Sequence, residues 1–227
     1  MGILNATPDS FYEPSRHNMS ILDEDGVDIV DIGACSTRPG SIPVSEEEEW
    51  RRLEPVIRKV LSRDVHPDIS VDTFRSGIVS RVYDLAGPFI VNDVTSGAGD
   101  PCMLPLVRKL GLKYVAVHNT GKIVGSEDPE SEEPVLKRVI SFFKDFERRA
   151  DGIEWILDPG FGFGKTYEEN WELLEHLDAL HCFNRPVLVG VSRKKMTKGT
   201  KEETIRAHKI AIERGASILR VHELPIL

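Results

Sequence analysis

"IEWILDPGFGFGKT", residues 153–166, places an apolar run, a glycine-rich turn and the start of a helix one after another. A turn of this kind that ends in Lys-Thr is typical of loops that bind nucleotide phosphates. A Walker A loop would need a glycine where the chain has Pro159, and the dinucleotide motif would need one where it has Lys165. We therefore interpret the stretch as one strand–turn–helix unit of an α/β fold, and not as a nucleotide loop.

The same unit recurs along the whole chain, because short apolar runs alternate with longer helical stretches. Mostly continuous apolar runs are typical of parallel strands covered on both faces. Strict alternation predicts a parallel sheet, and eight strands favour a closed (β/α)₈ TIM barrel, formed as one domain over residues 1–227. The predicted strands are "GILN" (2–5), "VDIVDIG" (27–33), "ISVD" (69–72), "FIVND" (89–93), "YVAVH" (114–118), "EWILD" (154–158), "VLVGVS" (187–192) and "SILRVH" (217–222).

Four amphipathic stretches are the clearest helix candidates between these strands. The stretch 45–62 opens with Ser45 and Glu48, which form a capping-box pair, and Pro55 inside it is expected to kink or shorten the helix. The other three predicted helices cover residues 134–150, 166–180 and 201–216.

The composition argues against several classes of protein. The net charge of −8 and the pI near 5.4 give a nucleic-acid partner no electrostatic support. No apolar run approaches the roughly 20 residues that a membrane span needs, and the N-terminus lacks the basic flank of a signal peptide. Three widely spaced cysteines without a CxxC pair favour a cytoplasmic, reduced protein without structural zinc.

Polar residues gather where the predicted strands end, and in a barrel these ends converge on the face where active sites form. A lone polar residue at such a place is most often a turn former, but so many together predict a ligand site. Carboxylates and an amide suit a nitrogen-rich ring, whereas Lys194, Arg220 and His222 suit a phosphate. Two long polar loops, 5–18 and 35–45, are candidate lids. The strand-end residues are Asn5, Asp72, Asn92, Asp93, His118, Asn119, Asp158, Ser192, Arg220 and His222.

Seven motifs give the sequence a resemblance to a known family. "MGILNATPDSF", "DIGACSTRPGS", "ISVDTF", "IVNDVTSG", "LDPGFGFGK", "VLVGVSRKK" and "ILRVH" occur in the order, and nearly at the spacing, of the dihydropteroate synthases. The resemblance covers almost the whole chain. It implies a pterin-binding TIM barrel that condenses 6-hydroxymethyl-7,8-dihydropterin pyrophosphate with p-aminobenzoate, giving 7,8-dihydropteroate and pyrophosphate in folate synthesis.

The resemblance also implies a role for particular residues, with Mg²⁺ as the cofactor. The pterin ring would contact Asp72, Asn92, Asp158, Lys194 and Arg220. The p-aminobenzoate site, where sulfonamides would compete, would consist of Thr37, Arg38, Pro39, Phe163 and Lys194. The pyrophosphate would contact Asn5, Arg220 and His222, with Asn5 as the Mg²⁺ ligand.

The mechanism that the resemblance implies is dissociative. Pyrophosphate leaves first, a pterin-methyl cation persists, and the arylamine then attacks it. Asp72 and Asp158 would favour such a cation electrostatically, and Lys194 completes the expected catalytic set. Lys165, by contrast, is expected to have no special role, because Lys194 is the better candidate for the working lysine.

The chain also departs from the family pattern. The segment before the second strand and the segment before the eighth are short, so we expect shortened helices there, and no eighth helix follows the last strand. Lys195 stands where serine is common beside the aminobenzoate carboxylate, and the family commonly forms homodimers. Two alternatives remain: a non-catalytic or folding-impaired pterin-binding homologue, and a methyltransferase barrel that uses methyltetrahydrofolate.

Overall fold

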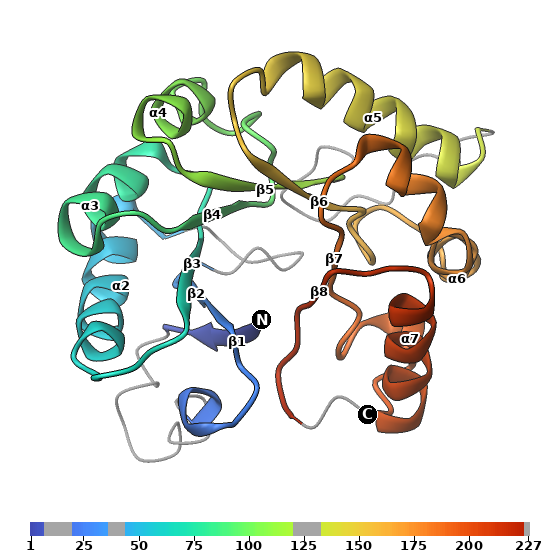
Figure 1. Cartoon of the computed structure of the whole chain (residues 1–227), viewed down its shortest axis with the longest axis horizontal. Coiled ribbons are helices and arrows are strands. Elements are labelled where there is room, and N and C mark those ends of the chain that lie inside the picture. The colour runs from blue at the N-terminus through green and yellow to red at the C-terminus, as the bar shows by residue number, and fades with distance from the viewer. Residues whose placement is uncertain (7–19, 36–43, 120–132, 225–227) are drawn as a thin grey trace.

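The structure is a computed structural model of the chain and describes residues 1–6, 20–35, 44–119 and 133–224. Eight parallel strands form a ring with the helices outside it, as predicted (Figure 1). Strands β1 to β6 pair in sequence order as one sheet, and β7 pairs with β8. The strands are β1 (Gly2–Asn5), β2 (Ile29–Gly33), β3 (Asp68–Asp72), β4 (Ile90–Asp93), β5 (Lys113–Val117), β6 (Trp155–Asp158), β7 (Leu188–Val189) and β8 (Ile218–Leu219).

Two isolated bridge pairs join the six-stranded and two-stranded sheets into a closed ring. Leu157 pairs with Val187 on one side, and Gly2 pairs with Val221 on the other. On the second side Ile3 donates its backbone N–H to the Val221 carbonyl at 2.9 Å. The (β/α)₈ barrel predicted from the alternating pattern is therefore confirmed.

Alternate residues of each strand face opposite sides of the barrel wall. One apolar cluster, which includes Val30 and Ile32, lies between the strands and the helices. A second cluster, which includes Ile90, Val115 and Ile156, draws no residue from a helix, so it marks the barrel interior. This alternation decides which polar side chains point into the barrel.

Helices fill the connections between the strands. The α-helices are α2 (Glu46–Leu61), α3 (Ser76–Ala86), α4 (Met103–Leu110), α5 (Val135–Arg149), α6 (Tyr167–Glu175) and α7 (Lys201–Glu213). The 3₁₀ helices are η3 (Ser20–Asp23), η4 (Leu177–Phe183) and η5 (Lys195–Thr197).

Most predicted helices are confirmed, with differences in detail. Ser45 accepts a hydrogen bond from the Glu48 N–H, which is one half of the predicted capping box, while the Glu48 carboxylate contacts Arg51 and Arg52. Pro55 does not shorten the helix, because buried Val56, Ile57 and Val60 hold the following turns against the core. The predicted helix 166–180 ends as α6 at Glu175 and continues as η4. Before β2 the described residues contain η3, before β8 the connection holds η5 and the full helix α7, and after β8 the described residues contain no further helix.

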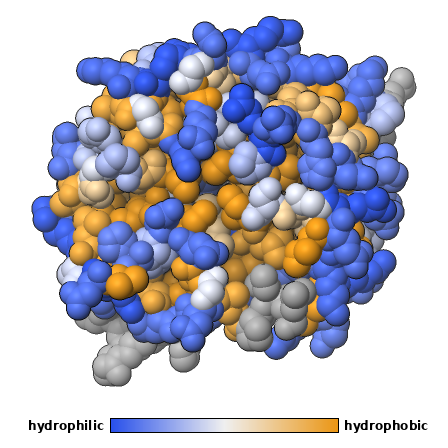
Figure 2. All heavy atoms as spheres, in the orientation of Figure 1, coloured by the Kyte–Doolittle hydropathy of each residue, from blue (hydrophilic) through white to orange (hydrophobic). Residues whose placement is uncertain are grey.

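On the face of the molecule seen in Figure 1 and Figure 2, hydrophilic residues are densest around the rim, and hydrophobic residues are more frequent toward the centre. Within the described part of the chain, every helix is too short or too polar to cross a membrane.

Candidate active site

A carboxylate that the sequence analysis did not select, Asp31, lies at the centre of the polar cluster inside the barrel. It is fully buried on β2 and accepts hydrogen bonds from Ser70 Oγ at 2.6 Å, from Asn92 Nδ2 at 3.0 Å and from Arg220 Nε at 2.7 Å. These partners come from β3, from β4 and from the residue after β8, so Asp31 connects strands that are far apart in sequence. The available signal was a charged residue inside the apolar run 27–33, since buried charge is paired in folded proteins.

Arg220 joins two carboxylates. Besides its contact with Asp31, its Nη2 lies 3.2 Å from Asp72 Oδ2. Burial, and then the charge of Asp31, raise the pKa of the Asp72 carboxyl to about 7 against the opposing effect of the Arg220 guanidinium. Two carboxylates thus share one guanidinium, and the cluster binds a further proton near neutral pH.

Two of the predicted strand-end residues point away from the barrel interior. Asp93 accepts hydrogen bonds from Tyr114 Oη at 2.6 Å and from the backbone N–H of Thr95 and Gly97, so it shapes the turn after β4. His118 packs edge-on against Phe142 of α5, 5.1 Å between ring centroids. Both residues stand one position from an inward-facing neighbour, and strand alternation therefore excludes them from the interior. Asn119 donates to the Val94 carbonyl at 3.3 Å and bridges two loops.

Asp158 and Lys194 form the second half of the site. Asp158 is buried at the end of β6 and accepts the Gly160 N–H at 2.8 Å; burial raises the pKa of its carboxyl, and nearby Lys194 opposes this shift. Lys194 Nζ donates to the Phe161 carbonyl at 2.5 Å and lies 5.0 Å from the centre of the Phe163 ring. Burial lowers the pKa of the Lys194 ammonium to about 8.

Gly190 lies between the two halves, within reach of both cationic side chains. A Cβ on Gly190 would lie 3.7 Å from Arg220 Cβ and 4.0 Å from Lys194 Nζ. The predicted residues Asp72, Asn92, Asp158, Lys194 and Arg220 therefore line one region at the strand ends.

The predicted phosphate-binding residues lie at neighbouring strand ends. Asn5 is exposed at the end of β1 and stands in register with Gly33 of β2, beside Asp72. His222 Nδ1 lies 3.1 Å from Ser192 Oγ, which joins the segments after β7 and β8. Polar side chains suited to an anion therefore continue outward from the Arg220 cluster.

The p-aminobenzoate prediction is only partly described by the structure. Phe163 is half-buried and packs against the interior cluster, and it faces Lys194. Thr37, Arg38 and Pro39 lie outside the described residues, and their predicted role stays a prediction. Lys195 is exposed in η5.

Lys165, for which the sequence predicts no special role, is in contact with the backbone of the glycine-rich loop. Its amine is enclosed by backbone carbonyls of the loop between β6 and α6, and burial lowers its pKa to about 7.

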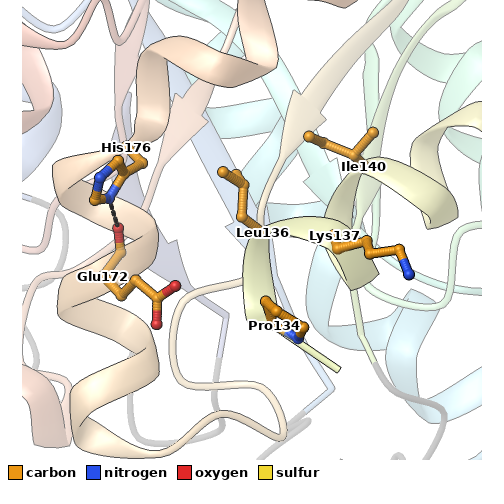
Figure 3. A pocket seen from close by; sticks show the side chains of 6 residues that line it. All are labelled: Pro134, Leu136, Lys137, Ile140, Glu172 and His176. Atoms are coloured by element: carbon orange, nitrogen blue, oxygen red, sulfur yellow. Dashed lines mark hydrogen bonds between the residues drawn. The ribbon is translucent and has the colours of Figure 1, made fainter. Parts of the chain in front are cut away.

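Elsewhere, a cavity of about 370 Å³ lies in the helical layer between α5 and α6 (Figure 3). Its lining residues are Pro134, Leu136, Lys137, Ile140, Glu172 and His176. They include none of the inward-facing strand residues, so this cavity is separate from the site. Among the described residues, no three His, Cys, Asp or Glu side chains gather into a group that could hold a metal ion.

A closed parallel barrel with carboxylates, an amide and cations at its strand ends defines a class of enzyme that binds a polar heterocycle and an anion. The family described as "Pterin binding enzyme" matches residues 1–222, and the chain belongs to this family.

The similar proteins within this family include dihydropteroate synthases. The chain is 36% identical over 246 residues to the dihydropteroate synthase of Escherichia coli, covering 99% of this chain and 86% of that protein. It is 37% identical over 245 residues to a probable bifunctional folylpolyglutamate synthase/dihydropteroate synthase of Haloferax volcanii, of whose length it spans 29%. The solved structure of Xanthomonas albilineans dihydropteroate synthase with 4-aminobenzoic acid superposes with a TM-score of 0.85 at 35% identity, covering 100% of this chain and 88% of that one.

Proposed function

We propose that the protein is a dihydropteroate synthase, a transferase that joins 6-hydroxymethyl-7,8-dihydropterin pyrophosphate to p-aminobenzoate. The observation that carries the proposal is the inward-facing set of Asp72, Asn92, Asp158, Lys194 and Arg220 around one region of the barrel. Full-length similarity to named synthases supports the same reaction. In this reaction the bond between the pterin methylene carbon and the pyrophosphate oxygen breaks, a carbon–nitrogen bond to the arylamine forms, and the amine loses a proton.

The pterin ring is recognised by acceptors and donors fixed before it binds. The carboxylates of Asp72 and Asp158 accept from ring N–H and amino groups, and Asn92 has its amide oriented by Asp31. The raised pKa values of both carboxyls mean that they are underpaired in the free protein, and a ligand with several N–H donors stabilises their ionised forms. The same two charges favour a pterin-methyl cation after pyrophosphate leaves.

The pyrophosphate lies toward Asn5, Arg220 and His222. Asn5 offers an amide oxygen at an exposed strand end, which suits one position on Mg²⁺, an ion that usually keeps several waters and substrate phosphate oxygens as its other ligands. Such an ion, when bound, neutralises charge on the leaving group.

The arylamine occupies the space between Phe163 and Lys194, with Thr37, Arg38 and Pro39 completing that site. The ring of Phe163 gives an apolar wall, and the Lys194 ammonium attracts the p-aminobenzoate carboxylate. Sulfonamides compete for this half of the site because they share the arylamine. The net charge of −8 argues against a nucleic-acid partner, and the three free cysteines support a cytoplasmic location. The protein is also proposed to form a homodimer, which the mass of the protein in solution tests.

One assay tests the proposal. The purified chain receives the pterin pyrophosphate and Mg²⁺, and pyrophosphate release is measured with and without p-aminobenzoate. We expect release that depends on the arylamine and is lost in Lys194→Ala and Asp158→Ala, while Lys209→Ala, which changes an exposed lysine of α7, retains it. Equal release in all four proteins would contradict the proposal. Pterin binding without turnover would identify a non-catalytic homologue, and methyl transfer from methyltetrahydrofolate would identify a methyltransferase.

A further inference from the structure

The amine of Lys165 binds the protein's own backbone. Nζ lies 2.8 Å from the Gly160 carbonyl oxygen, 3.1 Å from that of Phe163 and 3.4 Å from that of His118. An ammonium has three N–H donors and no acceptor, so these three carbonyls account for its full capacity. Lys165 thus connects both ends of the glycine-rich loop to the end of β5.

The loop needs such a contact because its path brings carbonyl groups together. Gly160 has φ +71°, and a Cβ there would lie 1.9 Å from the His118 carbonyl oxygen, so the backbone of the loop packs directly on the end of β5. Converging carbonyl dipoles repel one another unless a donor lies between them. The amine also lies near the Asp158 charge, which offsets part of the cost of burying an ammonium beside Lys194 and Arg138.

Both lysines donate to backbone carbonyls of the loop. Lys165 binds the carbonyls of Gly160 and Phe163, while Lys194 binds the carbonyl of Phe161 between them. Because its carbonyl is fixed, Phe163 presents its ring to Lys194 at 5.0 Å from the ring centre to Nζ. The distance between Phe163 and Lys194, which line the arylamine site, therefore depends on Lys165, which does not line it.

We propose that Lys165 is a positioning residue for the p-aminobenzoate half of the site: it fixes the backbone of residues 160–163 so that Phe163 and Lys194 face each other, without contacting either substrate. This inference rests on the proposed function. It predicts a much larger effect on p-aminobenzoate than on the pterin, because Asn92 and Arg220 contact Asp31, and Asp72 contacts Arg220, without a contact to the loop.

The test compares Lys165→Met, which has no donor, with Lys165→Gln, which keeps two N–H donors, and with Lys209→Met on the surface of α7 as the matched control. Steady-state kinetics are measured for each substrate separately. Losing the hydrogen bonds should raise the KM for p-aminobenzoate about tenfold in Lys165→Met, with a smaller rise in Lys165→Gln. The KM for the pterin pyrophosphate should stay within about twofold of wild type in both variants, and Lys209→Met should match wild type.

Equal rises in both KM values, or a loss of kcat alone, would overturn the proposal, because they indicate general damage to the site. If circular dichroism shows that Lys165→Met does not fold, Lys165→Gln decides the question by the same ratio of KM values. Calorimetric titration of p-aminobenzoate into protein saturated with a pterin that lacks the pyrophosphate leaving group, together with free pyrophosphate, makes the comparison without turnover. A wild-type chain that binds no arylamine, or that releases no arylamine-dependent pyrophosphate, counts against the proposed function. Equal arylamine affinity in wild type and variants counts against the positioning role.

Discussion

Replacing Asp31 by asparagine tests the electrostatic centre of the barrel. The substitution keeps the shape of the side chain but removes the charge that Arg220 contacts at 2.7 Å. Asp72 remains as the second partner of that guanidinium, and its ionisation depends on pH. We therefore expect Asp31→Asn to destabilise the fold by an amount that changes with pH.

The size of the effect follows from the Asp72 carboxyl. Its pKa is raised to about 7, first by burial and then by Asp31, so its stabilising contribution is present at low pH and is lost as pH rises through about 7. At pH 5 Asp72 is mostly neutral in wild type, so after removal of the Asp31 charge the guanidinium is paired only if Asp72 releases its proton, and the cost is about 3 kcal/mol. At pH 8 Asp72 is ionised, continues to neutralise Arg220 and no longer repels Asp31, so the cost falls to about 1–2 kcal/mol.

Urea unfolding at pH 5 and pH 8 gives both free energies, with unchanged m-values as the condition for comparing them. Asp23→Asn is the matched control, because Asp23 pairs with Arg63 while its side chain is 69% exposed. This control should cost under about 1 kcal/mol at either pH. An Asp31→Asn penalty that is equal at the two pH values, or larger at pH 8, would refute the reasoning.

Two further predictions concern the loop and its neighbouring lysine. Gly160→Ala should lower the free energy of unfolding by about 3 kcal/mol or more, because it adds both a left-handed alanine and a clash with the His118 carbonyl. Gly152 has a similar φ of +75°, but a Cβ there would lie 3.7 Å from its nearest neighbour, so Gly152→Ala should cost less in the same thermal or urea unfolding experiment. Equal costs for the two variants would show that the clash at Gly160 is relieved without strain. The kcat/KM for p-aminobenzoate should fall as pH rises through about 8, since burial lowers the pKa of the Lys194 ammonium to that value and the charge is lost above it. A pH–rate profile of Lys194→Arg should lack this fall, and a flat wild-type profile would contradict the assigned role.

The fold and much of the site could be predicted from local sequence. Continuous apolar runs separated by helices gave the eight strands, and strand-end positions gave Asp72, Asn92 and Asp158, because these signals depend only on neighbours along the chain. The same alternation, applied within each strand, would also have excluded Asp93 and His118.

The remaining parts depend on contacts between distant segments. Asp31 gains its importance from the β2–β3 register, which sets it opposite Ser70, and from Arg220, which lies 189 residues away in sequence and is brought near by closure of the ring. The contacts of Lys165 could not be predicted because its partners are carbonyl oxygens, whose convergence depends on the path of the backbone and not on side-chain type.

The carboxylates and the cations of the site come from different parts of the barrel. The six-stranded sheet carries the acceptors Asp31, Asp72 and Asp158, whereas the segments that follow β7 and β8 carry the cations Lys194 and Arg220. The two sheets meet along seams made of the bridges Leu157–Val187 and Gly2–Val221. A substrate that contacts both sets of charges therefore connects the two sheets, and its binding free energy adds to the stability of the closed ring. In this barrel, pterin binding should therefore also stabilise the pairing of β7 and β8 with the six-stranded sheet.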